Sequence, residues 1–317
     1  CNRRRTVGLT SDQKDMCQKN LDLMTSVVQA AKQTIDVCQE IFFEKRWNCS
    51  TILNAAKFLR DLTGGSREQA FVYSLAAGSL AQTIAKACSS GLTSKCGCAQ
   101  IPTEPAPGNF RWGGCRDDVK FGVAFSRQFT DQTESRRKKR SKDVLMNVDN
   151  AHVGRKMLAD SIAAICKCHG VSGSSSLKTC FKSLPALKVV AVMLQNRYSA
   201  AVEMGDNAAR ISALQTTGSK KSSRSLSKRV ASTDRLVFSS ISPDYCLPDP
   251  SVRSVGTQGR ECDKDSTGSS ACRSMCCGRG YVSEIVVQTF KCNCKYYWCC
   301  EVKCKVCRKL VEVHKCR

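Results

Sequence analysis

The sequence predicts an α+β protein, with a helical N-terminal domain that carries one disulfide-pinned β-hairpin and a small, cystine-rich C-terminal domain of β-hairpins. The distribution of cysteine predicts the division. Eleven of the 23 cysteines lie between Cys1 and Cys180, none lies at 181–245, and twelve lie between Cys246 and Cys316. The spacing of apolar residues predicts the two kinds of structure, because it is helical in the first part and typical of short strands in the second.

We therefore expect domains at 1–215 and 246–317, joined by a linker at 216–245. The stretch 216–229, TTGSKKSSRSLSKR, contains Ser, Lys and Arg but almost no large apolar residue, which is typical of a flexible linker. The cysteine density beyond it is typical of a chain held by cross-links rather than by a large core.

Four helices are predicted in the first domain. Helical spacing or a helix start signal marks the stretches 10–38, 66–88, about 144–165 and about 186–202. Thr10 or Ser11 can cap the first helix, and Ser66 with Gln69 forms a capping-box pattern ahead of the second. We expect the apolar faces of these helices to form the core.

A hairpin is predicted between the third and fourth helices. Cys166 and Cys168 at one end and Cys180 at the other bracket a segment rich in Gly and Ser. A bridge from Cys166 to Cys180 would pin a hairpin whose tip presents Ser172 beside Gly173, open to a modifying enzyme. Composition alone supports only a flexible glycine-serine loop.

In the second domain, strands are predicted at 281–290 and 296–306. Disulfides explain the cysteines better than zinc does. Adjacent Cys276-Cys277 has no natural place in a tetrahedral site, and the chain has only three histidines. No metal is expected.

The cysteine content also indicates an oxidising compartment, and the sequon at Asn48 agrees with N-glycosylation on a secretory route. No apolar run approaches the roughly 18–20 residues that cross a bilayer. We expect a secreted protein.

The positive charge predicts a polyanionic partner. Lys and Arg number 50 against 27 Asp and Glu, a net charge of +23. No nucleic-acid-binding signature accompanies it, so extracellular sulfated glycosaminoglycan is the expected polyanion, with a merely solvated surface as the alternative. The stretch 137–140 fits a cleavage site for a basic-residue convertase, but we expect an exposed loop that is not cut. The basic clusters lie at 136–140, at 220–229, and at Lys303, Lys305, Arg308 and Lys309.

No enzymatic signature is found. Ser172 is one glycine out of place for a Gly-x-Ser-x-Gly nucleophile elbow, and nearby His169 has no identifiable acidic partner. The chain has no phosphate-cradling glycine loop and no His-Glu-x-x-His. We expect a protein that is not an enzyme.

The chain resembles the Wnt family of secreted, lipid-modified signalling proteins, in order along essentially its whole length. The segments 68–73 and 104–114 look most like the eleventh Wnt subfamily. The motifs that carry the family resemblance are Arg46-Trp-Asn-Cys-Ser50, Phe110-Arg-Trp-Gly-Gly-Cys115, Cys166-Lys-Cys-His-Gly-Val-Ser-Gly173, Met275-Cys-Cys-Gly-Arg-Gly-Tyr281 and Cys292-Asn-Cys-Lys-Tyr-Tyr-Trp-Cys-Cys300.

The resemblance implies a hand-shaped ligand of Frizzled receptors. Its thumb is the hairpin with Ser172, which the acyltransferase Porcupine modifies with palmitoleate and whose acyl chain enters the receptor's cysteine-rich domain. Its index finger is the C-terminal hairpin, which grips the same receptor domain through a tip matching Tyr297, Trp298, Cys299, Cys300 and Val302. No cofactor is implied besides the covalent lipid.

The resemblance also implies further partners and places. The implied partners are the carrier Wntless, heparan sulfate, and a co-receptor of the LDL-receptor-related or receptor-tyrosine-kinase type. Nucleic acid is not an expected partner. The expected location is the extracellular space or matrix. The alternative from another class is a lipid-independent, heparin-binding matrix protein, which Ser172→Ala would leave unaffected.

The family's bridges leave one cysteine over. Cys168 lacks a partner because the position seven residues on, where the family has a cysteine, is Ser175, and the usual Trp after Cys180 is Phe181. The implied bridges are Cys38–Cys49, Cys88–Cys96, Cys98–Cys115, Cys166–Cys180, Cys246–Cys277, Cys262–Cys272, Cys276–Cys316, Cys292–Cys307, Cys294–Cys304 and Cys299–Cys300, with Cys1–Cys17 a further expected pair.

Overall fold

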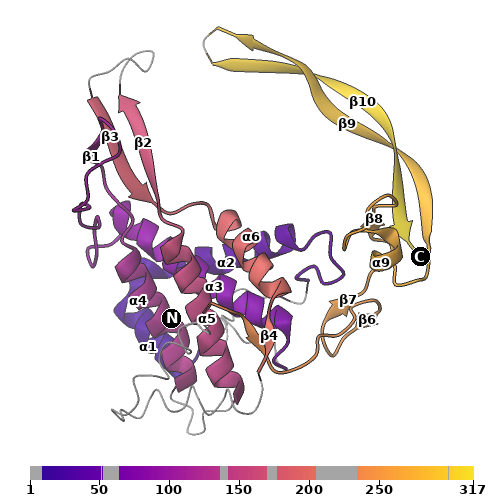
Figure 1. Ribbon diagram of the computed structural model, residues 1–317, viewed down its shortest axis with the longest axis horizontal. Helices are drawn as coiled ribbons and strands as arrows, with labels where there is room; N and C mark the ends of the chain where they lie inside the picture. Colours follow the sequence, from indigo (N-terminus) through magenta and orange to yellow (C-terminus); the bar gives the residue numbers. More distant parts are fainter. Residues whose placement is uncertain are drawn as a thin grey trace. The chain divides into compact units, whose positions relative to one another are not determined.

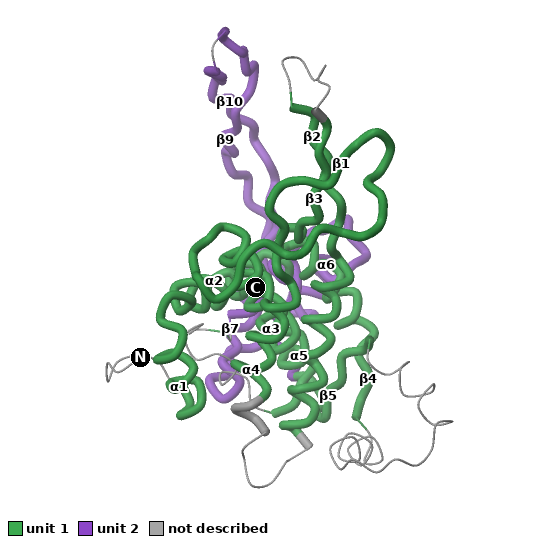
Figure 2. The backbone as a smooth tube through the Cα atoms, turned by 90° about the vertical axis from the view of Figure 1, so that its left-hand side faces the viewer, with its two compact units in different colours: residues 1–41, 52–242 green, residues 42–51, 243–317 purple. Residues whose placement is uncertain are grey.

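The computed structural model describes residues 9–50, 52, 64–135, 142–169, 177–204, 234–298 and 300–317. The chain divides into two compact units, residues 1–41 with 52–242 and residues 42–51 with 243–317 (Figure 2). Helices dominate the first unit and strands the second, which confirms the predicted α+β class. The stretch 216–229 lies outside the described residues, and the domain bounds expected from the sequence stay a prediction.

The first unit is built around one central helix. α3 is buried along nearly its whole length and packs against α2, α4, α5 and α6 (Figure 1). The bounds are α1 Ser11–Lys19, the 3-10 turn η1 Leu21–Leu23, α2 Met24–Ile41, α3 Arg67–Ser89, α4 Val119–Ser135, α5 Lys142–Asp160 and α6 Leu187–Ser199.

Two glycines let neighbouring helices approach α3 closely. A Cβ at Gly154 of α5 would collide with the backbone of Ser74, and a Cβ at Gly122 of α4 would collide with the backbone of Ala81. Backbone-to-backbone approach of this kind needs residues without side chains, so the close packing of α4 and α5 depends on these positions.

Capping follows the sequence in part. Thr10, rather than Ser11, caps α1, and it forms a full capping box with Gln13. Ser66 accepts a hydrogen bond from the Gln69 amide at 3.4 Å, but the Gln69 side-chain oxygen accepts from the Gly65 amide at 2.9 Å instead of from the Ser66 amide. The predicted capping box of α3 is therefore formed on one side only.

Three helix predictions need correction. The first helix is interrupted at Asn20, whose φ of −137° is not helical, before α2 begins at Met24. The third ends at Asp160 instead of about 165, because 163–169 forms a strand. The helix α4 was not predicted at all.

The strands of the first unit form two small sheets. β1 Arg111–Trp112, β3 Leu177–Ser183 and β2 Ala163–His169 lie in the order β1-β3-β2, with β1 parallel to β3 and β2 antiparallel to it. β4 Val202–Glu203 pairs in parallel with β5 Val237–Phe238.

The second unit contains one long hairpin and a small disulfide-rich base. The sheet order is β8-β10-β9, with antiparallel pairing throughout. Strands were predicted at 281–290 and 296–306. The second of these predictions is wrong because 296–306 spans the turn of the hairpin. The elements are β6 Pro248–Asp249, β7 Ser254–Val255, β8 Glu261–Cys262, α9 Cys272–Met275, β9 Tyr281–Tyr297 and β10 Glu301–Cys316.

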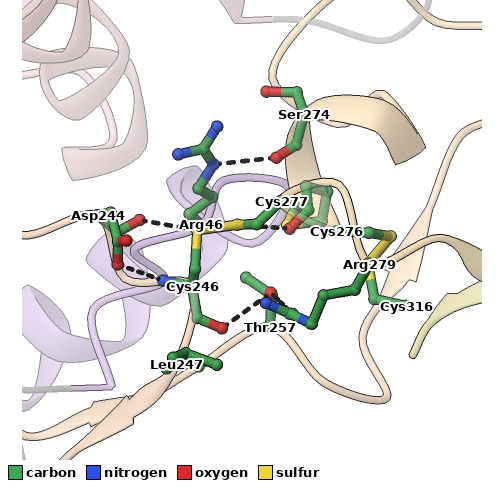
Figure 3. Close-up of a disulfide and its surroundings, with 12 residues drawn as sticks. Arg46, Asp244, Cys246, Leu247, Thr257, Ser274, Cys276, Cys277, Arg279 and Cys316 are labelled. Atoms are coloured by element: carbon green, nitrogen blue, oxygen red, sulfur yellow. Dashed lines mark hydrogen bonds between the residues drawn. A yellow bond between two sulfur atoms is a disulfide. The ribbon is translucent and has the colours of Figure 1, made fainter.

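Residues 42–51 belong to this unit through specific contacts. The guanidinium of Arg260 donates to the main-chain carbonyls of Phe43, Lys45 and Arg46 at 2.6–2.7 Å. The Arg46 Nε donates to the Ser274 carbonyl at 3.0 Å, beside the disulfide that joins Cys246 to Cys277 (Figure 3). These bonds hold the early segment against the base of the hairpin.

Among the described residues, no helix combines the length and apolar character needed to cross a bilayer.

Candidate functional site

The sequence-predicted site residues fall on two hairpins, one in each unit. We call β2–β3 the thumb hairpin and β9–β10 the finger hairpin. In the thumb hairpin, Cys166 pairs with Cys180 in register and the two form a disulfide with a Cα–Cα distance of 4.0 Å. The predicted tip, with Ser172, Gly173 and Ser175, lies outside the described residues.

The base of the thumb hairpin is fixed to the helical core. The carboxylate of Asp117 accepts hydrogen bonds from the Leu184 amide at 3.0 Å and from the Ser183 and Ser89 hydroxyls at 3.2 and 2.7 Å. Ser89 is the last residue of α3, so a buried helix end, a carboxylate and a strand end meet at one point. The hairpin therefore leaves the core from an anchored base.

A third strand and a lysine stiffen the outer edge. β1 pairs with β3, and the Gly113 amide donates to the Cys180 carbonyl at 2.9 Å. The Lys182 ammonium contacts the Glu104 carboxylate and lies 5.9 Å from the centre of the Trp112 ring. The hydrogen bond from Lys182 lowers the pKa of the Glu104 carboxyl below its usual value.

Cys168 is free and exposed in the structure. It lies opposite Lys178 in the β2–β3 ladder, two residues from the bridged Cys166 on the same face. His169 contacts the hydroxyl of Thr179 across the ladder, with 2.6 Å between Nε2 and Oγ1. Among the described residues, no carboxylate contacts the Cys168 thiol or the His169 ring.

The finger hairpin contains a bulge with a disulfide on each side of it. The pairing shifts between Lys303 and Lys305 of β10, and Asn293 on β9 has a φ of 47°. Cys292–Cys307 precedes the shift and Cys294–Cys304 follows it.

The bulge decides which side chains share a face. Side chains in a strand alternate between faces, and one extra residue inverts the alternation beyond it. Val287 pairs with Leu310 below the bulge, and Tyr296 pairs with Val302 above it. Counting along the unbroken strand β10, residues 302, 304, 306, 308 and 310 lie on one face, so both pairs lie on that face, and the two flanking disulfides lie on opposite faces.

The tip of the finger hairpin exposes aromatic side chains. Trp298 is 94% exposed, and Tyr296, Tyr297 and Val302 are exposed beside it. Lys303 lies 5.5 Å from the centre of the Tyr297 ring and 3.3 Å from the Glu301 carboxylate. The predicted contact residue Cys299 lies outside the described residues, and Cys300 follows in the turn with a φ of 84°.

Eight disulfides have both partners identified among the described residues, and all eight are pairings that the family resemblance implies. Cys17, Cys38 and Cys49 are disulfide-bonded as well. The pairings Cys38–Cys49, Cys1–Cys17 and Cys299–Cys300 stay predictions. The bridges are Cys88–Cys96, Cys98–Cys115, Cys166–Cys180, Cys246–Cys277, Cys262–Cys272, Cys276–Cys316, Cys292–Cys307 and Cys294–Cys304.

A group of three sulfurs lies at the base of the finger hairpin. The Sγ atoms of Cys262, Cys276 and Cys316 are within 4.8 Å of one another. All three belong to disulfides, so they are not available as the thiolates that bind zinc. Their contact packs two bridges together in a small core with Met275.

The remaining predicted positions are partly described. The Asn48 side-chain oxygen accepts a hydrogen bond from the Ser50 amide at 3.2 Å, and the residue is half-buried. The basic stretches 136–140 and 220–229 lie outside the described residues. The third basic cluster is exposed along the finger hairpin at Lys303, Lys305, Arg308 and Lys309.

Comparison with known proteins agrees with this arrangement. A sequence model of the wnt family matches residues 5–317. The chain is 43% identical over 316 residues to Protein Wnt-11b of Xenopus laevis, which covers 98% of this chain and 87% of that protein. It is 41% identical over 314 residues to Protein Wnt-11 of Gallus gallus, covering 98% of this chain and 86% of that protein.

Solved structures include a similar fold. A chain in the structure of human WLS in complex with WNT8A matches with a TM-score of 0.62 and 30% identity, covering 93% of this chain and 94% of that chain. The relatives named Wnt-11 carry the subfamily number that segments 68–73 and 104–114 indicate. From the match over residues 5–317 and these relatives, the chain belongs to the Wnt family of signalling ligands.

Proposed function

We propose that this protein is a secreted, palmitoleoylated ligand that binds the cysteine-rich domain of Frizzled receptors through two hairpins. The acyl chain on Ser172 enters the receptor domain, and the finger tip with Tyr297, Trp298, Cys299, Cys300 and Val302 grips it elsewhere. The observation that carries the proposal is the finger tip, where Trp298 is 94% exposed on a hairpin held by disulfides. A rigid, exposed aromatic tip suits a binding hot spot, because little conformational entropy is lost when it binds.

The lipid supplies most of the affinity in this proposal. Burying an acyl chain contributes about 0.8 kcal/mol per methylene, so a chain of about sixteen carbons contributes on the order of 10 kcal/mol before the costs of binding. The anchored base of the thumb hairpin, tied through Asp117 to Ser89, supports this role because it limits the orientations of the tip.

Other partners follow from the same reading. Porcupine acylates Ser172, and the carrier Wntless takes the acylated protein through the secretory pathway. The likeness to a chain in the human WLS–WNT8A structure supports the second of these. Heparan sulfate retains the protein near cells through its basic clusters, Asn48 is glycosylated, and a co-receptor completes the signalling complex.

The proposal is tested by removing the lipid site and the tip separately. Ser172→Ala should abolish binding of the protein, purified from cell extract or medium, to a purified Frizzled cysteine-rich domain. Ser174→Ala, two residues away in the sequence, is the matched control and should bind as the unaltered protein does. Trp298→Ala should weaken binding by at least tenfold without preventing acylation.

The same variants distinguish the alternative function. The net charge of +23 favours a heparin-binding matrix protein that signals without lipid. If Ser172→Ala leaves both receptor binding and signalling unchanged, this second function replaces the first.

A further inference from the structure

The finger hairpin exposes apolar side chains well below its tip. Ile285, Val287, Val306 and Leu310 are 74, 59, 72 and 67% exposed. Val287 lies directly opposite Leu310. Ile285 lies two residues before Val287 on β9 and Val306 four residues before Leu310 on β10, both on the same face. We call these four residues the shaft patch.

The hairpin does not depend on burying the shaft patch. An isolated two-stranded ribbon is marginally stable, and antiparallel strands usually bury one face. Here Cys294–Cys304 ties the strands above the patch, Cys292–Cys307 ties them on the opposite face beside Val306, and Cys276–Cys316 ties β10 to the base below it. Cross-links thus hold the ribbon without a covering layer, and a cluster of apolar side chains left exposed on such a ribbon is a mark of an interaction site.

Charge around the patch indicates the chemistry of the partner. Arg308 lies between Val306 and Leu310 on the same face of β10, and Lys291 lies opposite Val306. Residues 281–317 contain eight Lys or Arg against three Glu. A complementary surface is therefore acidic. Because the patch itself is aliphatic, the surface also needs apolar side chains, which a protein has and a polysaccharide lacks.

The patch is too far from the tip for one receptor domain to cover both. Val287 precedes Tyr297 by ten residues, roughly 33 Å along an extended strand. A standard interface buries about 800 Å² per partner, a disc of about 16 Å radius. A domain centred on Tyr297 therefore leaves Val287, Leu310 and Ile285 uncovered and reaches only Val306, which lies four residues from Val302.

We propose that the shaft patch is the docking surface for a second protein, with an acidic and partly apolar surface, distinct from the receptor domain bound at the tip. The inference rests on the proposed function, in which the tip contacts Frizzled. One hairpin then holds two proteins at once.

The test changes the patch and leaves the tip intact. Val287→Glu combined with Leu310→Glu places two negative charges in the patch. The matched control is Val282→Glu combined with Gln288→Glu, which adds the same two negative charges to the opposite face of β9. Each full-length secreted variant is compared for affinity to a purified Frizzled cysteine-rich domain, for signalling at equal concentration, and for the salt that elutes it from heparin.

The patch variant should bind the Frizzled domain within twofold of the unaltered protein, yet need at least tenfold more protein for half-maximal signalling. The control should signal normally and elute from heparin at the same reduced salt as the patch variant, because both variants gain the same negative charge. If the patch variant signals normally, or the control loses as much signalling, the proposal is wrong. An equal loss of signalling in the control would identify a polysaccharide as the partner, because only the charge of the hairpin would then matter. If the unaltered protein does not bind the Frizzled domain, the proposed function itself fails.

A photo-crosslinking residue identifies what lies on the patch. Benzoylphenylalanine in place of Val287 should crosslink, on Frizzled-bearing cells, to a protein other than Frizzled, and the same residue in place of Gln288 should not. A crosslink from position 287 to Frizzled alone contradicts the proposal. If the glutamate variant is not secreted, Val287→Thr with Leu310→Thr replaces it, since threonine favours strands without apolar surface.

Discussion

Cys168 lies directly across the β2–β3 ladder from Lys178, and its thiol is free and exposed. The Cys166–Cys180 bridge is two residues away on the same face. The thumb hairpin is thus pinned by one bridge where the family resemblance implies two. The second bridge is missing because residue 175 is a serine.

Restoring the second bridge should tighten the thumb hairpin. In Ser175→Cys, a disulfide to Cys168 should remove its reaction with iodoacetamide and stabilise the protein by about 2–3 kcal/mol, because it closes a short loop in the unfolded chain. Ser174→Cys is the control and should leave Cys168 reactive. Labelling of Cys168 in the Ser175→Cys protein would show that these positions do not meet.

The buried ion pair between α4 and α5 should be essential to the helical unit. Arg155 donates to both carboxylate oxygens of Asp131, at 3.1 and 2.7 Å, and to the Thr130 hydroxyl at 3.0 Å. Arg155→Met leaves a buried carboxylate without its charge partner, which should reduce the free energy of unfolding in urea by about 3–5 kcal/mol. Lys156→Met removes the neighbouring exposed pair with Asp234 and should leave the urea midpoint nearly unchanged. Equal losses in the two variants would contradict this account.

The close approach of α5 to α3 should not tolerate a methyl group. Gly154→Ala would drive a Cβ into the backbone of Ser74 and force the helices apart, with an expected loss of about 1–3 kcal/mol. Gly97→Ala is the control, because no atom lies within 4 Å of the Cβ it adds. Thermal unfolding followed by circular dichroism measures both. An unchanged midpoint for Gly154→Ala would mean that the helices do not pack as described.

Stability should fall at alkaline pH through Tyr198. Its hydroxyl donates to the Glu68 carboxylate at 2.8 Å, and burial, with the nearby carboxylate, raises the pKa of Tyr198 above its ordinary value of 10.0. The native state therefore holds the phenolic proton more tightly than the unfolded chain does. The stability that this proton contributes is fully present below about pH 10 and is lost as the pH rises above it.

Tyr198→Phe tests this dependence. The variant should be less stable at neutral pH, because Glu68 loses its partner, but its free energy of unfolding should change less steeply between about pH 9.5 and 11.5. Both proteins are measured with Cys168 alkylated, so that the free thiol does not exchange with disulfides. Identical slopes would exclude Tyr198 as the responsible group.

The sequence predicts elements best where a local signal decides the structure. The Ser66 cap and the Ala-rich run were enough for α3. In contrast, the spacing of apolar residues leaves Ile165 compatible with either a helix or a strand. Its place in β2 is decided by the pairing of β2 with β3 and by the Cys166–Cys180 bridge. α4 was missed although Phe121, Phe125 and Phe129 recur at helical spacing.

Long-range features of the second unit could not be predicted in this way. Residues 42–51 join the second unit through hydrogen bonds from Arg260, which lies more than two hundred positions later in the sequence. The packing of Trp47 against Tyr245 adds a second long-range contact. The face on which Tyr296 lies depends on the bulge at Asn293, which inverts the alternation in β9. The tip residues were predicted from the family resemblance, whereas the shaft patch could be recognised only from the register of β9 and β10.

The most direct test of the central claim is mass spectrometry of the unreduced protein secreted from animal cells, on the peptide that holds Cys166 and Cys180. We expect a palmitoleoyl mass on Ser172, the Cys166–Cys180 bridge intact and Cys168 as a free thiol. An unmodified Ser172 in well-secreted, signalling protein would contradict the lipid-driven mechanism and favour a ligand that acts without lipid.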